Sequence, residues 1–234
     1  MARSTALPGQ GELDRESVGL ACAEAGVRLT ADQVDLLGRY LELLNRWNRV
    51  HSLTAIDEPR EQLIRHLLDS LIAEQALTGA VGSLVGVHVA DVGSGMGSPG
   101  LVWAAVMPES KFDLIERQQK KAAFLRHVVG QLGWGGRVQV AEGDVRQLWG
   151  RRCYGLITSR AFAGLEEFLR LTVNISEPGT LWAAMIGRLK KDVSEQLLLK
   201  MNSQTVEIHL QNLIPLHVPG LSAERHLLIA RRVT

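Results

Sequence analysis

Residues 87–101 read Val-His-Val-Ala-Asp-Val-Gly-Ser-Gly-Met-Gly-Ser-Pro-Gly-Leu, and this stretch decides the fold. A short apolar run ends at Asp91, glycines follow at every second position, and Pro99 stands where the first turn of a helix would begin. This order predicts a strand, a tight glycine loop and a helix. Glycine suits such a loop because a side chain would hold a ligand away from the backbone, and because the turn demands positive φ. The stretch therefore predicts a cradle for a nucleotide-like ligand.

Two chemistries use a cradle of this kind. Gly95, Gly97 and Gly100 satisfy the dinucleotide pattern G-x-G-x-x-G. Asp91 followed by Gly93, Gly95 and Gly97 also fits the acidic-x-Gly-x-Gly-x-Gly loop of S-adenosylmethionine (AdoMet) methyltransferases. A carboxylate ahead of the loop would repel an anionic pyrophosphate, whereas it attracts the cationic sulfonium and ammonium groups of AdoMet. Asp91 therefore favours AdoMet, and an NAD-linked oxidoreductase is the alternative.

The first third of the chain has helical periodicity. A capping box at Thr30 opens one amphipathic helix, and Pro59 opens a second. Arg65, His66 and Asp69 on the second helix are typical of a surface salt bridge beside a packed histidine. We therefore expect a flexible tail at 1–16 and a helical N-terminal segment at 17–80.

Strands and helices alternate after a glycine-spaced linker. The expected strands are 87–92, 111–116, 137–141, 155–158, 180–185, 205–210 and 226–230. The last two would form a terminal hairpin. We therefore expect an α/β fold: a doubly wound, mostly parallel seven-stranded sheet of the AdoMet-methyltransferase (Rossmann-like) type with an N-terminal helical extension. The methyltransferase domain would span 81–234.

Residues at strand ends supply further candidate cofactor contacts. Glu116 ends a predicted strand about twenty residues beyond the glycines, where an acid accepts hydrogen bonds from ribose hydroxyls. Asp144 lies in a loop where the adenine would lie. Arg160 follows the fourth strand, and the carboxyl ends of strands face the ligand crevice in open α/β folds.

Composition and charge limit the kinds of partner and the location that the protein can have. Residues 1–86 hold 8 Lys and Arg against 12 Asp and Glu, and residues 87–234 hold 18 against 13. The basic surplus accompanies the glycine loop, where it would meet an anionic substrate. We expect a cytoplasmic protein, since no apolar run could cross a bilayer and no signal core is present. No metal site is expected, and Cys22 and Cys153 should be free thiols.

Together these segments resemble the glucose-inhibited division protein B family, bacterial methyltransferases of the small-subunit ribosomal RNA. The resemblance covers most of the chain after residue 30. It rests on Arg46-Trp47-Asn48, Leu53-Thr54, Arg65-His66-Leu67-Leu68-Asp69-Ser70-Leu71, Asp91-Val92-Gly93-Ser94-Gly95 with Pro99-Gly100, Lys121 with Phe124-Leu125-Arg126, Ser159-Arg160-Ala161-Phe162-Ala163 and Glu224-Arg225-His226-Leu227.

The resemblance implies AdoMet as methyl donor and ring nitrogen 7 (N7) of a guanine in small-subunit (16S) ribosomal RNA as acceptor. The partner is then that RNA or the small ribosomal subunit, and we expect the protein to be a monomer. No catalytic base is expected, because N7 has a lone pair and no proton to lose, so alignment and charge stabilisation suffice.

The family pattern adds cofactor contacts at Gly93, Ser98, Val145, Arg146 and Arg160, and we take Arg65, Arg126, Arg160 and Arg225 as candidate RNA contacts. Ser98, Asp144, Arg146 and Ile186 differ from the family's usual residues. A methyltransferase of another RNA position and a non-catalytic RNA-binding or ribosome-assembly factor are therefore further alternatives.

Overall fold

The computed structural model describes residues 14–160, 164–188, 196–201 and 204–234. Residues 1–13, most of the expected tail, and Ala161, Phe162 and Ala163 of the family pattern lie outside this part. Arg15 and Glu16, assigned to the tail from the sequence, are the first two residues of a helix. In the described ranges, no helix is long and apolar enough to cross a membrane.

The N-terminal segment is helical, as predicted. Its elements are α1 (Arg15–Glu24), α2 (Ala31–His51), α3 (Pro59–Gln62), a π-helical segment η1 (Leu63–Leu68) and α4 (Asp69–Val81). The predicted capping box at Thr30 is confirmed, and Pro59 opens α3. In η1, the N–H of Asp69 donates to the carbonyl of Ile64 five residues earlier, so the predicted single helix contains one wider turn.

Strands and helices then alternate. They are β1 (His88–Val92), α5 (Gly100–Val106), β2 (Lys111–Glu116), α6 (Gln119–Gln131), β3 (Val138–Glu142), the 3-10 turn η2 (Val145–Leu148), β4 (Tyr154–Arg160), α7 (Leu165–Thr172), the 3-10 turn η3 (Val173–Ile175), β5 (Ser176–Ile186), β6 (Gln196–Met201), β7 (Gln204–Leu216) and β8 (Arg225–Arg232).

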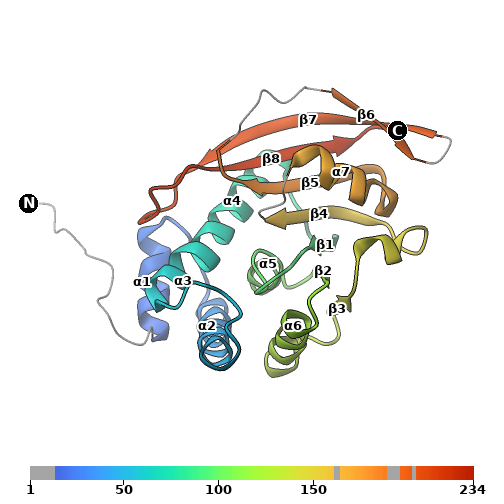
Figure 1. The fold of residues 1–234 in the computed structure, drawn as a ribbon. Coiled ribbons are helices and arrows are strands. Elements are labelled where there is room, and N and C mark those ends of the chain that lie inside the picture. Colours follow the sequence, from blue (N-terminus) through green and yellow to red (C-terminus); the bar gives the residue numbers. More distant parts are fainter. Residues whose placement is uncertain (1–13, 161–163, 189–195, 202–203) are drawn as a thin grey trace, which may run out of the picture.

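The strands form one sheet in the order β3-β2-β1-β4-β5-β8-β7-β6 (Figure 1). β1 to β5 are parallel, and β8, β7 and β6 pair antiparallel. The described residues thus contain eight strands rather than the expected seven. The additional strand, β6, is the edge strand, and its Leu-Leu-Leu run has no period-two alternation that predicts a half-exposed strand.

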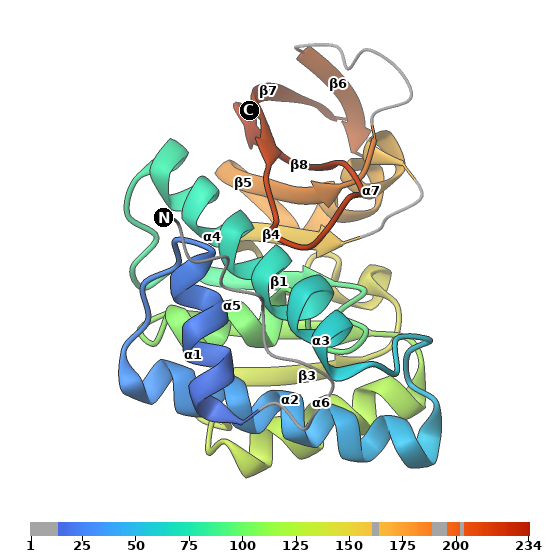
Figure 2. The ribbon, with the colours of Figure 1, turned by 90° about the vertical axis from the view of Figure 1, so that its left-hand side faces the viewer.

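Helices cover both faces of the sheet. Buried residues of α1, α2, α4, α5 and α6 share one core with Val89, Phe112 and Leu156 on one face. On the other face, α7 and η3 pack against Ile157 and Trp182. Figure 2 shows the N-terminal helices beside α5 and α6 rather than as a separate body. The fold is therefore doubly wound, and the N-terminal segment completes one of its layers.

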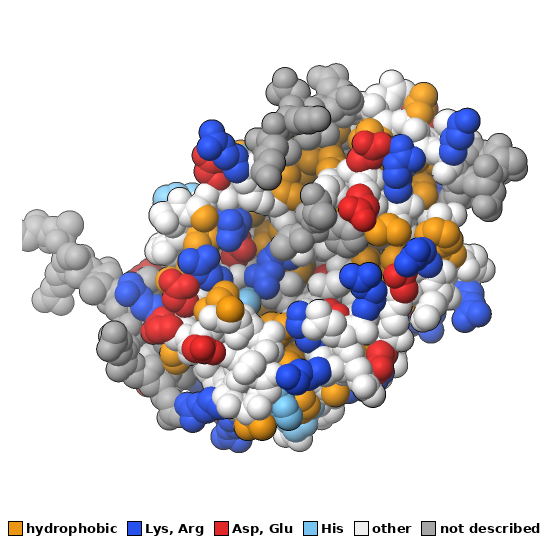
Figure 3. Space-filling model, in the orientation of Figure 1, with side chains coloured by type: hydrophobic (Ala, Val, Ile, Leu, Met, Phe, Trp, Pro, Cys, Tyr) orange, Lys and Arg blue, Asp and Glu red, His pale blue; other side chains and the backbone are white. Residues whose placement is uncertain are grey.

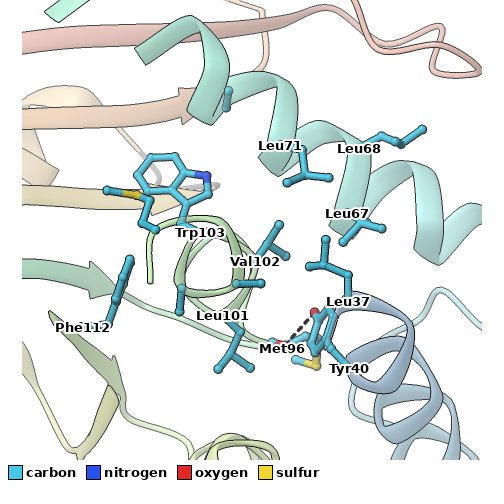
Figure 4. Packing of buried hydrophobic residues seen from close by; sticks show 14 of the residues in the cluster. Leu37, Tyr40, Leu67, Leu68, Leu71, Met96, Leu101, Val102, Trp103 and Phe112 are labelled. Carbon is cyan, nitrogen blue, oxygen red and sulfur yellow. Dashed lines mark hydrogen bonds between the residues drawn. The ribbon is translucent and has the colours of Figure 1, made fainter. Parts of the chain in front are cut away.

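The N-terminal helices also hold the glycine loop in place. The hydroxyl of Tyr40 on α2 donates to the carbonyl of Met96 at 3.0 Å (Figure 4). The indole of Trp103 on α5 donates to the carbonyl of Ser70 on α4 at 2.8 Å. Both bonds are buried, where a hydrogen bond is costly to break, so the position of the loop depends on these helices.

Candidate functional site

A cavity of about 380 Å³ lies at the carboxyl ends of the parallel strands, and we call it the cofactor cradle. The carboxyl ends of β1, β2 and β4 and the loops after β1, β2 and β3 supply most of its wall. Its lining residues are Val92, Gly93, Gly95, Ile115, Glu116, Arg117, Gln118, Lys121, Gly143, Asp144, Val145, Ser159, Arg160, Glu167 and Leu171. Six predicted cofactor residues meet there: Gly93, Gly95, Glu116, Asp144, Val145 and Arg160. Four others, Asp91, Gly97, Ser98 and Arg146, do not line it.

The glycines serve two purposes in this loop. Gly93 has φ +76°, and a Cβ built on it would meet no protein atom within 4 Å, so it would project into open space beside the cradle. Gly97 has φ +90°, and a Cβ there would lie 2.2 Å from Cδ1 of Leu101. Gly93 therefore leaves room for a ligand, whereas Gly97 is required by packing.

Glu116 joins the loop after β1 to the end of β2. One carboxylate oxygen accepts the N–H of Gly95 at 2.9 Å, and the other accepts the N–H of Gln118 at 2.8 Å. A carboxylate oxygen has two lone pairs, so each retains capacity for a ligand hydroxyl. Glu116 is thus placed both to fix the loop and to bind a ribose.

Asp91 lies behind the glycine loop and is not among the residues that line the cradle. Its side chain is fully buried, and Oδ2 accepts the N–H of Gly100 at 3.0 Å. Burial raises the pKa of this carboxyl to about 7, although the bond from Gly100 opposes the shift. The sequence placed Asp91 correctly at the end of β1 but could not show that its carboxylate turns toward the first residue of α5.

Ser98 also points away from the cradle. Its buried hydroxyl is 2.6 Å from the hydroxyl of Ser70 and donates to the carbonyl of His66 at 3.0 Å. Ser98 therefore ties the glycine loop to the π-helical segment.

Arg146 forms a bidentate ion pair with Asp144, at 2.8 Å for both Nε–Oδ1 and Nη2–Oδ2. Hydrogen bonds from Arg146 hold the pKa of Asp144 at about 2, well below its usual value. Asp144 also accepts the N–H of Arg146 and caps η2. The pair fixes the loop in which Val145 contributes to the cradle, while the guanidinium of Arg146 lies outside it.

Arg160 stands at the end of β4 and lines a second cavity as well. This second hollow has a volume of about 290 Å³, and it is lined by Ile56, Arg65, His66, Asp69, Arg160, Met185, Ile186, Gly187 and Arg225. Arg160 Nη1 donates to the carbonyl of Arg65 at 2.6 Å, and Nη2 donates to Nδ1 of His66 at 3.1 Å. The two cavities therefore share one guanidinium.

The four candidate RNA contacts occupy different surroundings. Arg65 pairs with Glu61 at 2.6 Å and lines the second hollow with Arg160 and Arg225. Arg126 pairs with Glu142 at 2.8 Å and lines neither cavity.

Figure 3 shows Lys and Arg side chains around a hollow in the middle of the face seen in Figure 1, with Asp and Glu among them. Such a face attracts an anionic partner.

The sequence placed His66 and Asp69 in a surface salt bridge beside a packed histidine and did not predict them as site residues. The surface location is wrong. Both are almost completely buried, at 3% and 1% exposure, and both line the second hollow. Burial, with the charges of Arg160 and Arg65, lowers the pKa of His66 to about 3, so the imidazole is neutral at pH 7. Burial raises the pKa of Asp69, whereas Arg225 and Arg160 oppose this. Their spacing of three residues on one helix face was the available signal.

In the part of the chain that the structure describes, no three His, Cys, Asp or Glu side chains are grouped to hold a metal. The cradle offers instead what an AdoMet molecule needs: open space beside Gly93, a strand-end carboxylate at Glu116 and a capped third loop at Val145.

Comparisons with known proteins agree with this geometry. A solved structure of a mutant of MtNAS in complex with S-adenosylmethionine superposes with a TM-score of 0.55 at 14% identity, covering 94% of this chain and 84% of that one, which is a likeness of fold. The family model described as GidB, rRNA small subunit methyltransferase G, matches residues 33–228.

Two curated relatives are named ribosomal RNA small subunit methyltransferase G. The one from Laribacter hongkongensis is 38% identical over 213 residues, 91% of this chain and 96% of the relative. The one from Cupriavidus pinatubonensis is 38% identical over 238 residues, 98% of each chain.

Together with the family model and the curated relatives, the fold identifies the chain as an AdoMet-dependent methyltransferase. Within that class, the chain belongs to the rRNA small subunit methyltransferase G family. This membership rules against the NAD-linked oxidoreductase that the glycine spacing left open.

Proposed function

We propose that this protein transfers a methyl group from AdoMet to N7 of a guanine in 16S ribosomal RNA. One observation carries the proposal: the cofactor cradle and a second, polar hollow share Arg160 at the carboxyl ends of the strands. A donor and an acceptor molecule thus have adjoining places. We further propose that the enzyme acts as a monomer in the cytoplasm, where its substrate, the RNA or the small ribosomal subunit, is assembled.

In this proposal, four positions hold the cofactor. Gly93 and Gly95 admit it close to the backbone, Glu116 accepts its ribose hydroxyls, and Val145 contacts the adenine. AdoMet supplies a methyl group on a cationic sulfur. Asp91, Ser98 and Arg146 act by positioning, since their polar atoms hold the loops and do not line the cradle.

The chain contributes alignment rather than proton transfer to the reaction. N7 of guanine has an in-plane lone pair and no proton, so no base is required. A mechanism without a base agrees with the surroundings of His66, because its low pKa keeps the imidazole uncharged, and so a weak base, at physiological pH. Arg160 is held by two acceptors and presents a fixed positive charge between the two cavities. Its role is to orient the base. It does not stabilise the developing charge, because methylation at N7 leaves the base positively charged.

Arg65 and Arg225 contact RNA at the second hollow in this proposal, and Arg126 contacts a phosphate outside it. Arg65 and Arg126 pair with surface carboxylates that a phosphate can replace, whereas Arg225 donates to the carbonyl of Glu224 and to the buried Asp69. Their contributions are electrostatic and decrease with salt.

The test is transfer of tritium from labelled AdoMet to small ribosomal subunits that lack this methyl group, followed by mapping of the modified nucleotide. We expect label at N7 of a single guanine. Label at another atom or base would overturn the proposed acceptor. Absence of label while AdoMet binds in equilibrium dialysis would overturn the proposed substrate, and absence of AdoMet binding would overturn the assignment of the cradle.

A further inference from the structure

The second hollow contains two buried polar atoms without a hydrogen-bond partner among the described residues. They are Nε2 of His66 and Oδ1 of Asp69. Buried polar groups in proteins are satisfied in the large majority of cases, so an unpaired group in a cavity wall indicates a ligand. Two such groups from one turn of the same helix indicate a ligand with complementary polar atoms.

The hydrogen-bonding character of each atom follows from its neighbours. A guanidinium has donors only, so Nδ1 of His66 must be the acceptor for Arg160, and the proton of the neutral imidazole is on Nε2. Oδ2 of Asp69 accepts from Nε of Arg225 at 3.4 Å, which leaves Oδ1 as an unused acceptor. The hollow thus offers one neutral donor and one carboxylate acceptor, with the buried Met185 as an apolar wall.

Every RNA base has one donor and one acceptor on its Watson–Crick edge, but guanine alone has two adjacent donors there that one carboxylate can accept. Its Watson–Crick edge presents two adjacent donors, N1–H and the 2-amino group, followed by the acceptor O6. Adenine and cytosine place a ring acceptor where guanine has N1–H. Uracil has one N–H beside a carbonyl, but it lacks the second donor and has no N7.

We propose that the second hollow binds the target guanine by its Watson–Crick edge, with the carboxylate of Asp69 accepting from N1–H and the 2-amino group, and Nε2–H of His66 donating to O6. This inference rests on the proposed function and deepens it by naming the residues that select guanine. The contact leaves N7 free, because N7 lies on the far side of O6 from N1. Arg160 lines both cavities and so lies where the base meets the cofactor cradle.

The test combines a change in the base with a change in the protein. Small subunits are reconstituted with RNA in which the mapped guanine is replaced by inosine, which lacks only the 2-amino group. Single-turnover transfer is measured with the original protein and with Asp69→Asn. We expect inosine to reduce kcat/KM about tenfold or more in the original protein, as for loss of a hydrogen bond to a charged group. We expect Asp69→Asn to methylate the guanine substrate at least tenfold more slowly than the original protein does. In this variant, replacing guanine by inosine should lower the rate by less than a further threefold.

Asp113→Asn is the matched control. Asp113 is also buried and ion-paired with an arginine, Arg152, but it lines neither cavity. This variant should retain the full discrimination against inosine. AdoMet affinity, measured by equilibrium dialysis, should be unchanged in Asp69→Asn, which shows that the cradle has stayed folded.

Equal rates for guanine and inosine in the original protein would overturn the inference even if Asp69→Asn did not fold. A full inosine penalty in a folded Asp69→Asn would overturn it as well. Absence of transfer to the guanine substrate itself would instead overturn the proposed function, so the two failures are distinguishable.

Discussion

The cofactor cradle and the second hollow meet at Arg160, yet they are built in different ways. The ends of parallel strands and the loops that follow them line most of the cradle, and three of its lining residues are glycines. The second hollow takes its polar side chains from the π-helical segment and the start of α4, from β4 and from β8. A site built on strand ends is encoded in short local motifs, whereas a site between elements depends on how those elements pack.

The buried carboxylates of the two regions illustrate the difference. Asp91 belongs to the motif that predicts the cradle, but its Oδ2 accepts the N–H of Gly100 and its side chain does not line the cradle. Asp69 belongs to no recognised catalytic motif, yet it lines the second hollow with a free oxygen. Motif position thus locates a loop, but only packing determines which side chain reaches the ligand.

The largest effect is expected at Gly100, where the start of α5 packs against Asp91 and Leu114 with no spare volume. In Gly100→Ala, the added Cβ would lie 2.5 Å from both Oδ2 of Asp91 and Cδ2 of Leu114. Overpacking and loss of the Asp91 bond together should lower the free energy of unfolding by about 4 kcal/mol, measured by urea denaturation. AdoMet affinity should also fall more than tenfold.

Gly130→Ala is the control for this change, because a Cβ there meets no atom within 4 Å. It should change the free energy of unfolding by less than about 1 kcal/mol. Equal stability of the two variants would show that this close contact does not hold the glycine loop. The loop would then not be fixed by its local sequence, as the comparison with the second hollow assumes.

An intermediate effect is expected from the titration of Asp91. The pKa of this carboxyl is about 7 in the folded protein against an ordinary value of 3.8, so the folded protein retains a proton that the unfolded chain releases. The contribution of this group to stability is therefore present below about pH 4 and is lost as pH rises to about 7.

Asp91→Asn removes this dependence while keeping an acceptor for Gly100. Relative to the original protein, the variant should gain on the order of 3 kcal/mol between pH 4 and pH 8, measured by denaturation at each pH. A difference that stays constant with pH would mean that the pKa of Asp91 is the same in the folded and the unfolded protein.

The smallest effect is expected outside both cavities. Arg126→Ala removes a surface ion pair with Glu142, so stability should change by less than about 1 kcal/mol. RNA affinity should fall, and the slope of its logarithm against the logarithm of salt concentration should decrease by about 1. Arg15→Ala, which breaks the exposed pair with Asp35 on the N-terminal helices, should leave this slope unchanged. Equal slopes for both variants would make Arg126 an ordinary surface residue.

The sequence predicted the fold class, the parallel core and the N-terminal helices because each is encoded in local periodicity and capping. Thr30 and Pro59 mark helix starts, and the apolar runs of β1, β2 and β4 are buried on both faces. The edge strand β6 was missed because its leucines have no period-two pattern, and the pairing with β7 that makes it a strand is a tertiary contact.

By itself, the sequence determined the cofactor cradle, since Gly93, Gly95, Glu116 and Val145 follow or end successive strands, and parallel strands bring their carboxyl ends to one edge. Tertiary structure alone decided that Asp91 and Ser98 turn inward and that His66 and Asp69 join Arg160 and Arg225 around a second hollow. The physical reason is distance along the chain: Asp69 and Arg225 are 156 residues apart, and no local pattern specifies a contact that forms only when α4 packs against β8.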